Sequence, residues 1–500
     1  MSPKNILDNN NTTKKNTSFV MATFLILLYS AIQIVLLLHH EPWEDEAQAW
    51  LIARDLDIVS IFRQMSYEGS PALWHMLLLP FAKTGLPYIS EFILHLIIAV
   101  AAVTVFVLYA PFSNLTKVLF IFSYYMAYEY SIIARTYSLS ILLVFLIAAL
   151  YNKRFEYPLW HAFLIFLLFN TNVHSFFISF SLTILFAWEI YRNSVQGGKP
   201  KIAVLVMCLG GLLSFFQLLP QPDTVDYRTF IACPLPAPFI ATANAFFPWE
   251  ALFCPLITQV EQRLILITIA VLIFFIVISS LSKKPVVLFM LLLSFSGLFY
   301  IFAFQYHGAR RHHGLILILL LFALWISRYY RDSQNKLSNK MKHIKLARLS
   351  IGLINVCLAL SLLYASGIQY LEYKYPFSGA KEMADFIMKN HLDQYTIIAT
   401  RSQAAALLPY FTEKKFWYAG IGAYGTFVTY NKKYLAGKEI SNEQVFSKIE
   451  KAFPDKSHLL LLLTKPLDFS ESHGFKLLYK VDKDIFGYGP EKFYLYEAIS

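Results

Sequence analysis

Long apolar runs separated by short polar segments dominate residues 1–370. Most runs are about 18–22 residues long, which is enough for a helix to cross roughly 30 Å of hydrocarbon. Backbone polar groups inside lipid must be paired within the same segment, so these runs predict helices. We expect eleven membrane-spanning helices, give or take two, at 18–38, 90–110, 117–133, 137–151, 158–171, 175–191, 202–219, 263–282, 285–304, 314–327 and 349–369.

The positions of Lys and Arg predict the orientation of these helices, because cytoplasmic loops are enriched in both residues. The tail at 1–17 carries three lysines and precedes the first helix, so we place it in the cytoplasm. The strongly basic loop at 328–348 then also faces the cytoplasm. The segment 39–88 becomes the first outer loop. Its apolar stretch at 71–82 is too short to span, and we expect it to lie in the membrane interface.

From residue 371 onward the pattern changes to that of a soluble domain. Helical spacing at 378–389, 404–411 and 442–452 alternates with strand-like runs at 395–400, 415–418, 458–464, 475–481 and 492–496. Such alternation predicts a small α/β domain. The expected fold is therefore an α-helical polytopic membrane protein with a cytoplasmic tail (1–17), a membrane domain (18–370) and an extracytoplasmic α/β domain (371–500).

Composition and charge agree with a membrane protein. Hydrophobic residues make up 57% of the chain and charged residues only 15%, whereas a soluble domain has about 25% charged residues. The net charge of +11 comes largely from the basic inner loops, so we expect the lipid bilayer and no nucleic acid as a partner. Cys233 and Cys254 lie in the Pro-rich outer loop at 220–262, where a disulfide and two free thiols are equally compatible with the sequence.

The first outer loop begins with four carboxylates in six residues, namely Glu41, Glu44, Asp45 and Glu46. Carboxylates at a membrane surface are costly to desolvate and need a partner or a purpose. They could act as a general base toward an acceptor hydroxyl or amine, or hold a divalent cation. The simpler interpretation is a solvated acidic loop that marks the edge of the bilayer.

Other unusual polar residues fall on the same predicted outer face. Arginine in an outer loop departs from the positive-inside bias, and its planar guanidinium suits a phosphate or pyrophosphate group. Arg135, Arg310 and Arg311 could therefore bind a lipid phosphate, assisted by His307 and His312. The remaining candidate residues on this face are Glu44, Tyr67, Glu68, Trp74, His75, Glu129, Tyr137 and His174.

Simpler interpretations exist for these residues as well. Arg135 could form an ion pair with Glu129 or with the acids of the first loop. The Arg-His cluster at 306–313 could anchor lipid headgroups, or its histidines could hold a metal ion, although their adjacency is not a known ligand spacing. Aromatic residues near helix ends are most often part of the interfacial belt.

Together these features resemble the GT-C superfamily of integral membrane glycosyltransferases. The closer likeness is to the branch of protein O-mannosyltransferases and lipid A aminoarabinose transferases. In that branch one helix leads into a long outer loop that opens with an acidic motif, which Asp45 and Glu46 match. The segment 69–74 (Gly-Ser-Pro-Ala-Leu-Trp) is similar to the small-Pro-small element that follows, and Arg135 occupies the next outer loop, where the branch carries a polar functional residue. The cluster at 310–313 and the C-terminal domain depart from the pattern.

The resemblance implies transfer of a sugar from a polyprenyl-phosphate carrier to an acceptor at the outer membrane face. Asp45 would be the base toward the acceptor or a ligand of a divalent metal ion, and Glu46 would orient it or share that role. Arg135, with Arg310 or Arg311, would hold the leaving phosphate.

The sequence leaves other functions and several details open. A transporter or lipid flippase is the main alternative, although that class places ionisable groups near the midplane. A non-catalytic module that displays the C-terminal domain is a second. The sugar and the acceptor (protein, glycan or lipid) are not specified, and the short loops favour a bacterial inner membrane.

Overall fold

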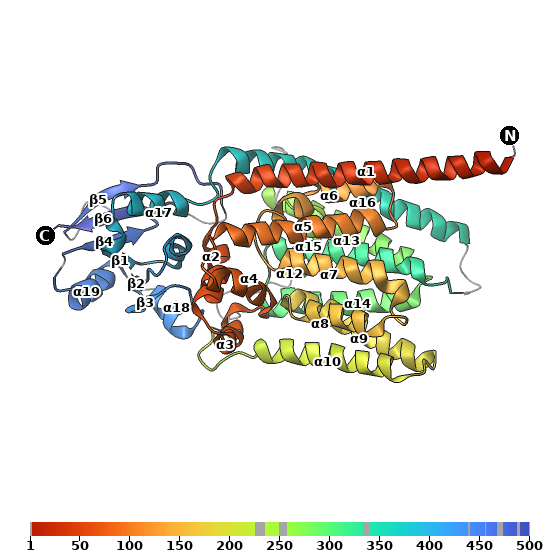
Figure 1. Ribbon diagram of the computed structural model, residues 1–500, viewed down its shortest axis with the longest axis horizontal. Helices are drawn as coiled ribbons and strands as arrows, with labels where there is room; N and C mark the ends of the chain where they lie inside the picture. The colour runs from red at the N-terminus through yellow and green to blue at the C-terminus, as the bar shows by residue number, and fades with distance from the viewer. Residues whose placement is uncertain are drawn as a thin grey trace.

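The computed structural model describes residues 3–225, 236–249, 258–333, 340–438, 441–455, 457–467, 474–487 and 491–499. Long helices run side by side along the longest axis of the molecule, and a small mixed sheet lies beyond one end of this bundle (Figure 1).

Within the described ranges, eight helical segments are long and apolar enough to cross a membrane. The first four are Phe19–His39 within α1 (Pro3–His39), α5 (Ile89–Tyr109), α9 (Val173–Arg192) and α10 (Gly198–Gln217). The others are α13 (Gln259–Ser280), α14 (Pro285–Tyr300) with η3 (Ile301–Gln305), α15 (Arg310–Ile326) with η4 (Ser327–Tyr329), and Lys345–Lys374 within α16 (Lys340–Lys374). They coincide with eight of the predicted spans, and the prediction of a helical membrane protein is confirmed.

The other three predicted spans take a different form. Two are short apolar helices, α7 (Tyr137–Leu150), which continues into η2 (Tyr151–Lys153), and α8 (Pro158–Phe169). The third, predicted as one helix at 117–133, is broken into α6 (Asn114–Ile121) and the π-helical turn η1 (Tyr125–Glu129). At the break, Ser123 donates its hydroxyl to the carbonyl of Phe120 at 2.7 Å, a back-bond that competes with regular helix hydrogen bonds.

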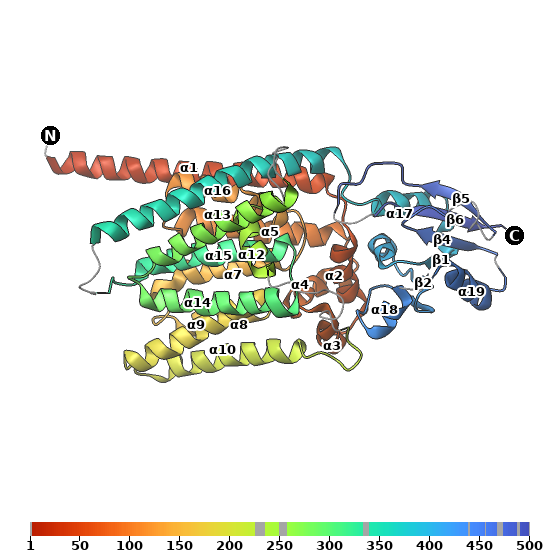
Figure 2. The same ribbon diagram turned by 180° about the vertical axis from the view of Figure 1, so that it is seen from behind.

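The two ends of the chain lie at opposite ends of the bundle. The N-terminus of α1 is at one end and the C-terminal domain at the other in both views (Figure 1 and Figure 2). A chain that crossed the bundle only eight times would finish at the same end of the bundle where it began. At least one shorter segment must therefore also traverse the bundle, while the count of eleven stays a prediction.

The predicted outer loop at 39–88 folds into three short helices at the end of the bundle that faces the C-terminal domain (Figure 1). They are α2 (Glu44–Asp55), α3 (Ile58–Glu68) and α4 (Leu73–Lys83). The predicted interfacial stretch at 71–82 forms most of α4. The Pro-rich loop at 220–262 contains a further helix, α12 (Ala237–Phe246), which packs against α13 and α15. Cys233 and Cys254 lie outside the described residues.

The C-terminal domain contains a mixed sheet with the strand order β3-β2-β1-β4-β6-β5. Its parallel strands are β1 (Thr396–Ala399), β2 (Phe416–Tyr418) and β4 (Leu459–Leu463), and its antiparallel strands are β3 (Ala423–Gly425), β5 (Phe475–Lys480) and β6 (Tyr494–Ala498). The helices are α17 (Ala380–Lys389), η5 (Leu392–Gln394), η6 (Ser402–Tyr410), α18 (Lys432–Lys438) and α19 (Asn442–Ala452). A strand forms at each position where the sequence predicts one, whereas β3 and α18 were not predicted.

Helix α2 joins this domain to the helical bundle. Nine of its twelve residues are buried. Ala47 and Leu51 pack into the core of the C-terminal domain, whereas Trp50 and Ala53 pack into the core of the bundle. The helix is therefore held from two sides, which fixes the position of the acidic residues in its first turn.

Candidate active site

A cavity of about 880 Å³ lies where the bundle meets the short helices of the first outer loop. Polar and charged residues of its lining come from α2, the turn before α7 and the first turn of α15, and apolar residues come from α9, α10 and α14. Ten of the fifteen candidate residues from the sequence line this one cavity: Asp45, Tyr67, Glu68, Trp74, His75, Arg135, Tyr137, His174, Arg311 and His312.

Asp45 lies between two arginines of the cavity lining. Its Oδ2 is 2.6 Å from Nη1 of Arg135 and 3.1 Å from Nη2 of Arg311. Among the described residues, none donates a hydrogen bond to its Oδ1. Burial raises the pKa of Asp45, but the two arginines more than offset this and hold its pKa below the ordinary value. Asp45 is therefore ionised at neutral pH and has one carboxylate oxygen free for a ligand.

Several buried side-chain nitrogens near Asp45 and the cavity have no protein partner among the residues that the structure describes. They are Nδ1 of His75, both ring nitrogens of His174 and Nε of Arg311. Buried polar groups without partners are rare in folded proteins, so they call for an explanation such as a ligand. In His312, Nδ1 accepts the backbone N–H of Ala309 at 2.7 Å, so the neutral ring carries its proton on Nε2. The Arg311 guanidinium and the protonated ring nitrogens of these histidines can donate to an anionic or oxygen-rich ligand.

Glu68 supplies a second carboxyl group to the cavity lining. Its Oε1 accepts hydrogen bonds from Nε2 of Gln48 and Nε2 of Gln64, both at 2.9 Å. Burial raises the pKa of Glu68 to about 7, although these hydrogen bonds and Arg135 act in the opposite direction. Glu68 therefore changes charge near neutral pH, unlike Asp45.

Glu46 does not line the cavity, although it is the neighbour of Asp45. Its side chain is fully buried, and its Oε2 lies 3.0 Å from Nε2 of His40. Its carboxylate also accepts the backbone N–H groups of Ala134 at 2.6 Å and Trp43 at 3.2 Å. Because Ala134 precedes Arg135, Glu46 ties the start of α2 to the loop that carries an arginine of the site. This geometry gives Glu46 a positioning role and does not support the predicted catalytic role.

Four more predicted residues lie outside the cavity lining. Arg310 donates to a tyrosine hydroxyl of α16 at 3.0 Å, and Glu129 accepts from a tyrosine hydroxyl just before η1 at 2.5 Å. Glu44 faces the C-terminal domain, where burial raises its pKa to about 7. The carbonyl oxygen of His307 is 3.0 Å from Nε2 of His313, so this histidine stabilises the turn before α15.

The structure offers no support for the predicted metal site. Within the described ranges, no group of three or more His, Cys, Asp or Glu side chains is placed to hold a metal ion. Asp45 and Glu46, the two predicted ligands, turn to different partners, the former to arginines and the latter to His40. Two guanidinium groups at Asp45 also repel a cation.

The structure adds three residues to the site that the sequence did not single out. Gln48 lies one helical turn after Asp45, so the spacing on α2 could have identified it. Asn172 caps α9 by accepting the N–H of Ser175 and lines the cavity. Tyr430 reaches the cavity from the C-terminal domain, and nothing in the sequence near it indicated this.

No protein-family model matches the chain, and no curated protein or solved structure is significantly similar to it. The fold therefore defines the class, a helical integral membrane protein that carries a small α/β domain.

Proposed function

We propose that the chain is a glycosyltransferase that moves a sugar from a polyprenyl-phosphate donor to an acceptor at the outer face of the membrane. The observation that carries this proposal is the combination of groups that line one cavity. A carboxylate with one free oxygen lies beside two arginines, and the same cavity is also lined by apolar side chains of α9, α10 and α14.

Some apolar residues of the lining are also exposed on the outer surface of the bundle. Phe215, Leu219 and Tyr300 line the cavity and are also 53%, 40% and 49% exposed. In a membrane, such side chains contact lipid tails. A lipid-linked donor can therefore place its tail at this opening while its phosphate reaches Arg135 and Arg311.

In the proposed reaction, Asp45 acts on the acceptor and the two arginines act on the phosphate of the donor. The acceptor hydroxyl attacks the anomeric carbon of the donor sugar and gives its proton to Oδ1 of Asp45. The bond between the anomeric carbon and the phosphate oxygen breaks, and its electron pair stays on the phosphate, where Arg135 and Arg311 stabilise the charge. Each guanidinium has five donors, so it can bind the phosphate and keep its contact with Oδ2 of Asp45.

The same proposal sets the orientation in the membrane. The cavity and the C-terminal domain lie at one end of the bundle, and the described residues on either side of the basic loop, in η4 and at the start of α16, lie at the other. The positive-inside bias then places the cavity and the C-terminal domain outside the cytoplasm. A bacterial inner membrane fits this arrangement.

Replacing both Arg135 and Arg311 with glutamine should weaken binding of a lipid phosphate by about 10-fold or more, since hydrogen bonds to charged groups contribute about 1.5–3 kcal/mol. Crosslinking of a photoreactive polyprenyl phosphate to purified protein in non-ionic detergent measures this. Arg63→Gln is the control, because Arg63 is exposed on α3 and lies outside the cavity lining. Equal crosslinking of the double variant and the control, with both proteins folded, would contradict the proposed donor site.

The KM for the donor should rise as the pH increases through about 7. Below this value Glu68 is protonated, and above it the carboxylate adds a negative charge beside Arg135 that competes with the phosphate. Glu68→Gln keeps the oxygen that accepts from Gln48 and Gln64 but cannot ionise, so its KM should not rise in this range. Parallel pH profiles of the wild type and the variant would show that another group is responsible.

A further inference from the structure

The C-terminal domain contains a second cavity, of about 610 Å³, at the carboxyl ends of its parallel strands. Arg401 follows β1, Gly420 follows β2 and Lys465 follows β4, and all three line the cavity. The strand β1 pairs with β2 on one side and with β4 on the other. The direction in which successive strands are added to the sheet therefore reverses at β1. Open parallel sheets form their binding crevices at such a point.

The lining of this cavity is strongly basic. Among the residues that the structure describes, the lining includes no acidic residue and five basic ones, Arg401, Lys415, Lys433, Lys438 and Lys465. All five are exposed, and none forms an ion pair within the described ranges of the chain. The buried carboxyl of Glu44 interacts with Lys438 but lies outside the lining. Like charges gathered in one cavity produce a positive potential that favours an anionic ligand.

The local backbone holds two of these lysines in place. Lys433 and Lys438 belong to α18, which approaches the end of β2 so closely that no side chain fits between them. A Cβ atom on Gly420 would lie 2.4 Å from the carbonyl oxygen of Gly437, and one on Gly437 would lie 2.6 Å from the carbonyl carbon of Gly420. The hydroxyl of Tyr434, also on α18, donates to Oγ of Ser402 at 2.9 Å. The cavity is therefore a defined feature of the fold.

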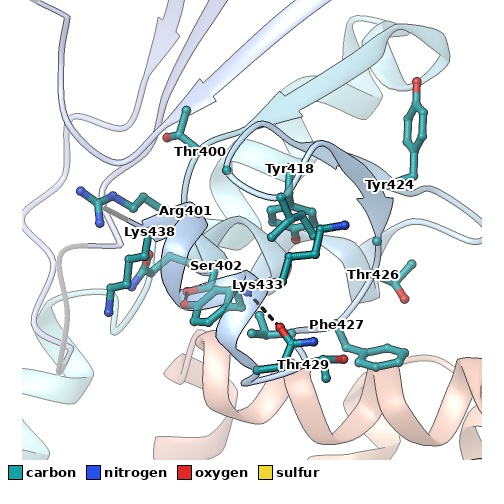
Figure 3. A pocket seen from close by; sticks show the side chains of 18 of the residues that line it. Thr400, Arg401, Ser402, Tyr418, Tyr424, Thr426, Phe427, Thr429, Lys433 and Lys438 are labelled. Carbon is teal, nitrogen blue, oxygen red and sulfur yellow. Dashed lines mark hydrogen bonds between the residues drawn. The ribbon is translucent and has the colours of Figure 1, made fainter. Parts of the chain in front are cut away.

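Aromatic and hydroxyl groups share this cavity with the basic side chains (Figure 3). Figure 3 shows Arg401 and Lys438 at one end of the cavity, Lys433 and Tyr418 near its middle and Tyr424 at the other end. Aromatic rings offer flat apolar faces on which a sugar ring can pack, while hydroxyl groups can pair with sugar hydroxyls. Arginine and lysine suit phosphate oxygens.

We propose that this cavity binds a saccharide that carries a phosphate group. It shares a wall with the cavity of Asp45. Val428 lines the second cavity and exchanges two hydrogen bonds, of 2.6 and 2.9 Å, with the side chain of Gln48 in the first, and Tyr430 lines the first cavity. Use of the bound saccharide as acceptor rests on the proposed function, whereas the binding itself does not.

Isothermal titration calorimetry of the full-length protein in non-ionic detergent tests this site. The probes are glucose 1-phosphate, a glycan oligomer with phosphodiester links, and glucose as the uncharged control. We expect at least one phosphate probe to bind and glucose not to bind. Arg401→Gln/Lys433→Gln should weaken binding by about 10-fold or more, because hydrogen bonds to charged groups are lost. Tighter binding of glucose 1-phosphate assigns the site to a soluble ligand, and tighter binding of the oligomer assigns it to a polymer.

Two matched variants make the result specific. Lys389→Gln/Lys476→Gln removes two exposed positive charges of the same domain outside the cavity and should bind like the wild type. Arg135→Gln/Arg311→Gln, which removes both guanidinium groups from the first cavity, should also bind these probes like the wild type, which separates this site from the proposed donor site. A Kd weaker than about 10 mM for both phosphate probes, equal binding of glucose, or unchanged binding by Arg401→Gln/Lys433→Gln would overturn the proposal.

Discussion

Replacing His40 with alanine should lower the free energy of unfolding by about 3–5 kcal/mol, because two buried carboxylates lose their shared partner. Nδ1 of His40 lies 2.8 Å from Oε1 of Glu372, and Nε2 lies 3.0 Å from Oε2 of Glu46. All three side chains are at most 1% exposed. This contact joins the end of α1, the first turn of α2 and α16, so its loss affects three elements at once.

The pH dependence of the free energy of unfolding is an independent test of this contact. Burial alone lowers the pKa of His40, but Glu46 and Glu372 raise it to about 10. The unfolded pKa is about 6.5, so the stabilising contribution is complete below pH 6.5 and is lost as the pH rises through about 10. The wild type should lose stability in this range more than the alanine variant does.

Equilibrium unfolding in mixed detergent micelles measures both effects. His39→Ala is the matched control, because His39 is exposed and contacts only the preceding turn and Tyr373 among the described residues. Its change in unfolding free energy should stay within about 0.5 kcal/mol. If His40→Ala were as stable as His39→Ala, the buried triad would not be an important contact.

Asp45→Asn should reduce sugar transfer by about 100-fold or more, since a positioned general base contributes about 10²–10⁴-fold. Asparagine has nearly the same shape but cannot take the acceptor proton. It also leaves Arg135 and Arg311 without their counter-charge, so the donor phosphate should bind as tightly as before or more tightly. The loss should therefore appear in kcat, with the KM for the donor unchanged or lower.

The control for this variant is Asp55→Asn, which removes an exposed carboxylate from the last turn of the same helix. It should transfer sugar at close to the wild-type rate. Melting temperatures of both variants establish that they are folded. Equal transfer rates for Asp45→Asn and Asp55→Asn would show that Asp45 is not the general base, without contradicting the transfer activity itself.

The membrane class of this protein could be predicted from its sequence because the physical constraint is strict. Lipid requires continuous apolar helices, and eight of the predicted apolar runs form such helices in the described part of the chain. Topology also placed Asp45, Arg135 and Arg311 on one face, although they are far apart in sequence, and the structure brings them into contact. The break at 117–133 was not predictable from the apolar run, because local hydrogen bonds such as that of Ser123 to Phe120 leave the hydropathy pattern unchanged.

The site was hardest to predict where two residues of similar chemistry are adjacent in the sequence. Asp45 and Glu46 are adjacent in sequence but point about 100° apart on a helix of 3.6 residues per turn, so one lines the cavity and the other is buried against His40. In the same way, Arg311 lines the cavity, whereas Arg310 donates a hydrogen bond to a tyrosine hydroxyl of α16. The second cavity was not predicted, because it combines residues from loops and from α18 that only the folded sheet brings together.

The most direct test of the proposed function is transfer of a labelled sugar by the purified wild-type protein in liposomes. The donors are mixed polyprenyl-phosphate sugars, and the acceptor is a cell-envelope extract. We predict that label passes from the lipid to an acceptor and that the phosphate stays on the lipid. Absence of transfer with every donor, together with movement of the intact donor lipid across the bilayer, would contradict a glycosyltransferase and indicate a lipid flippase.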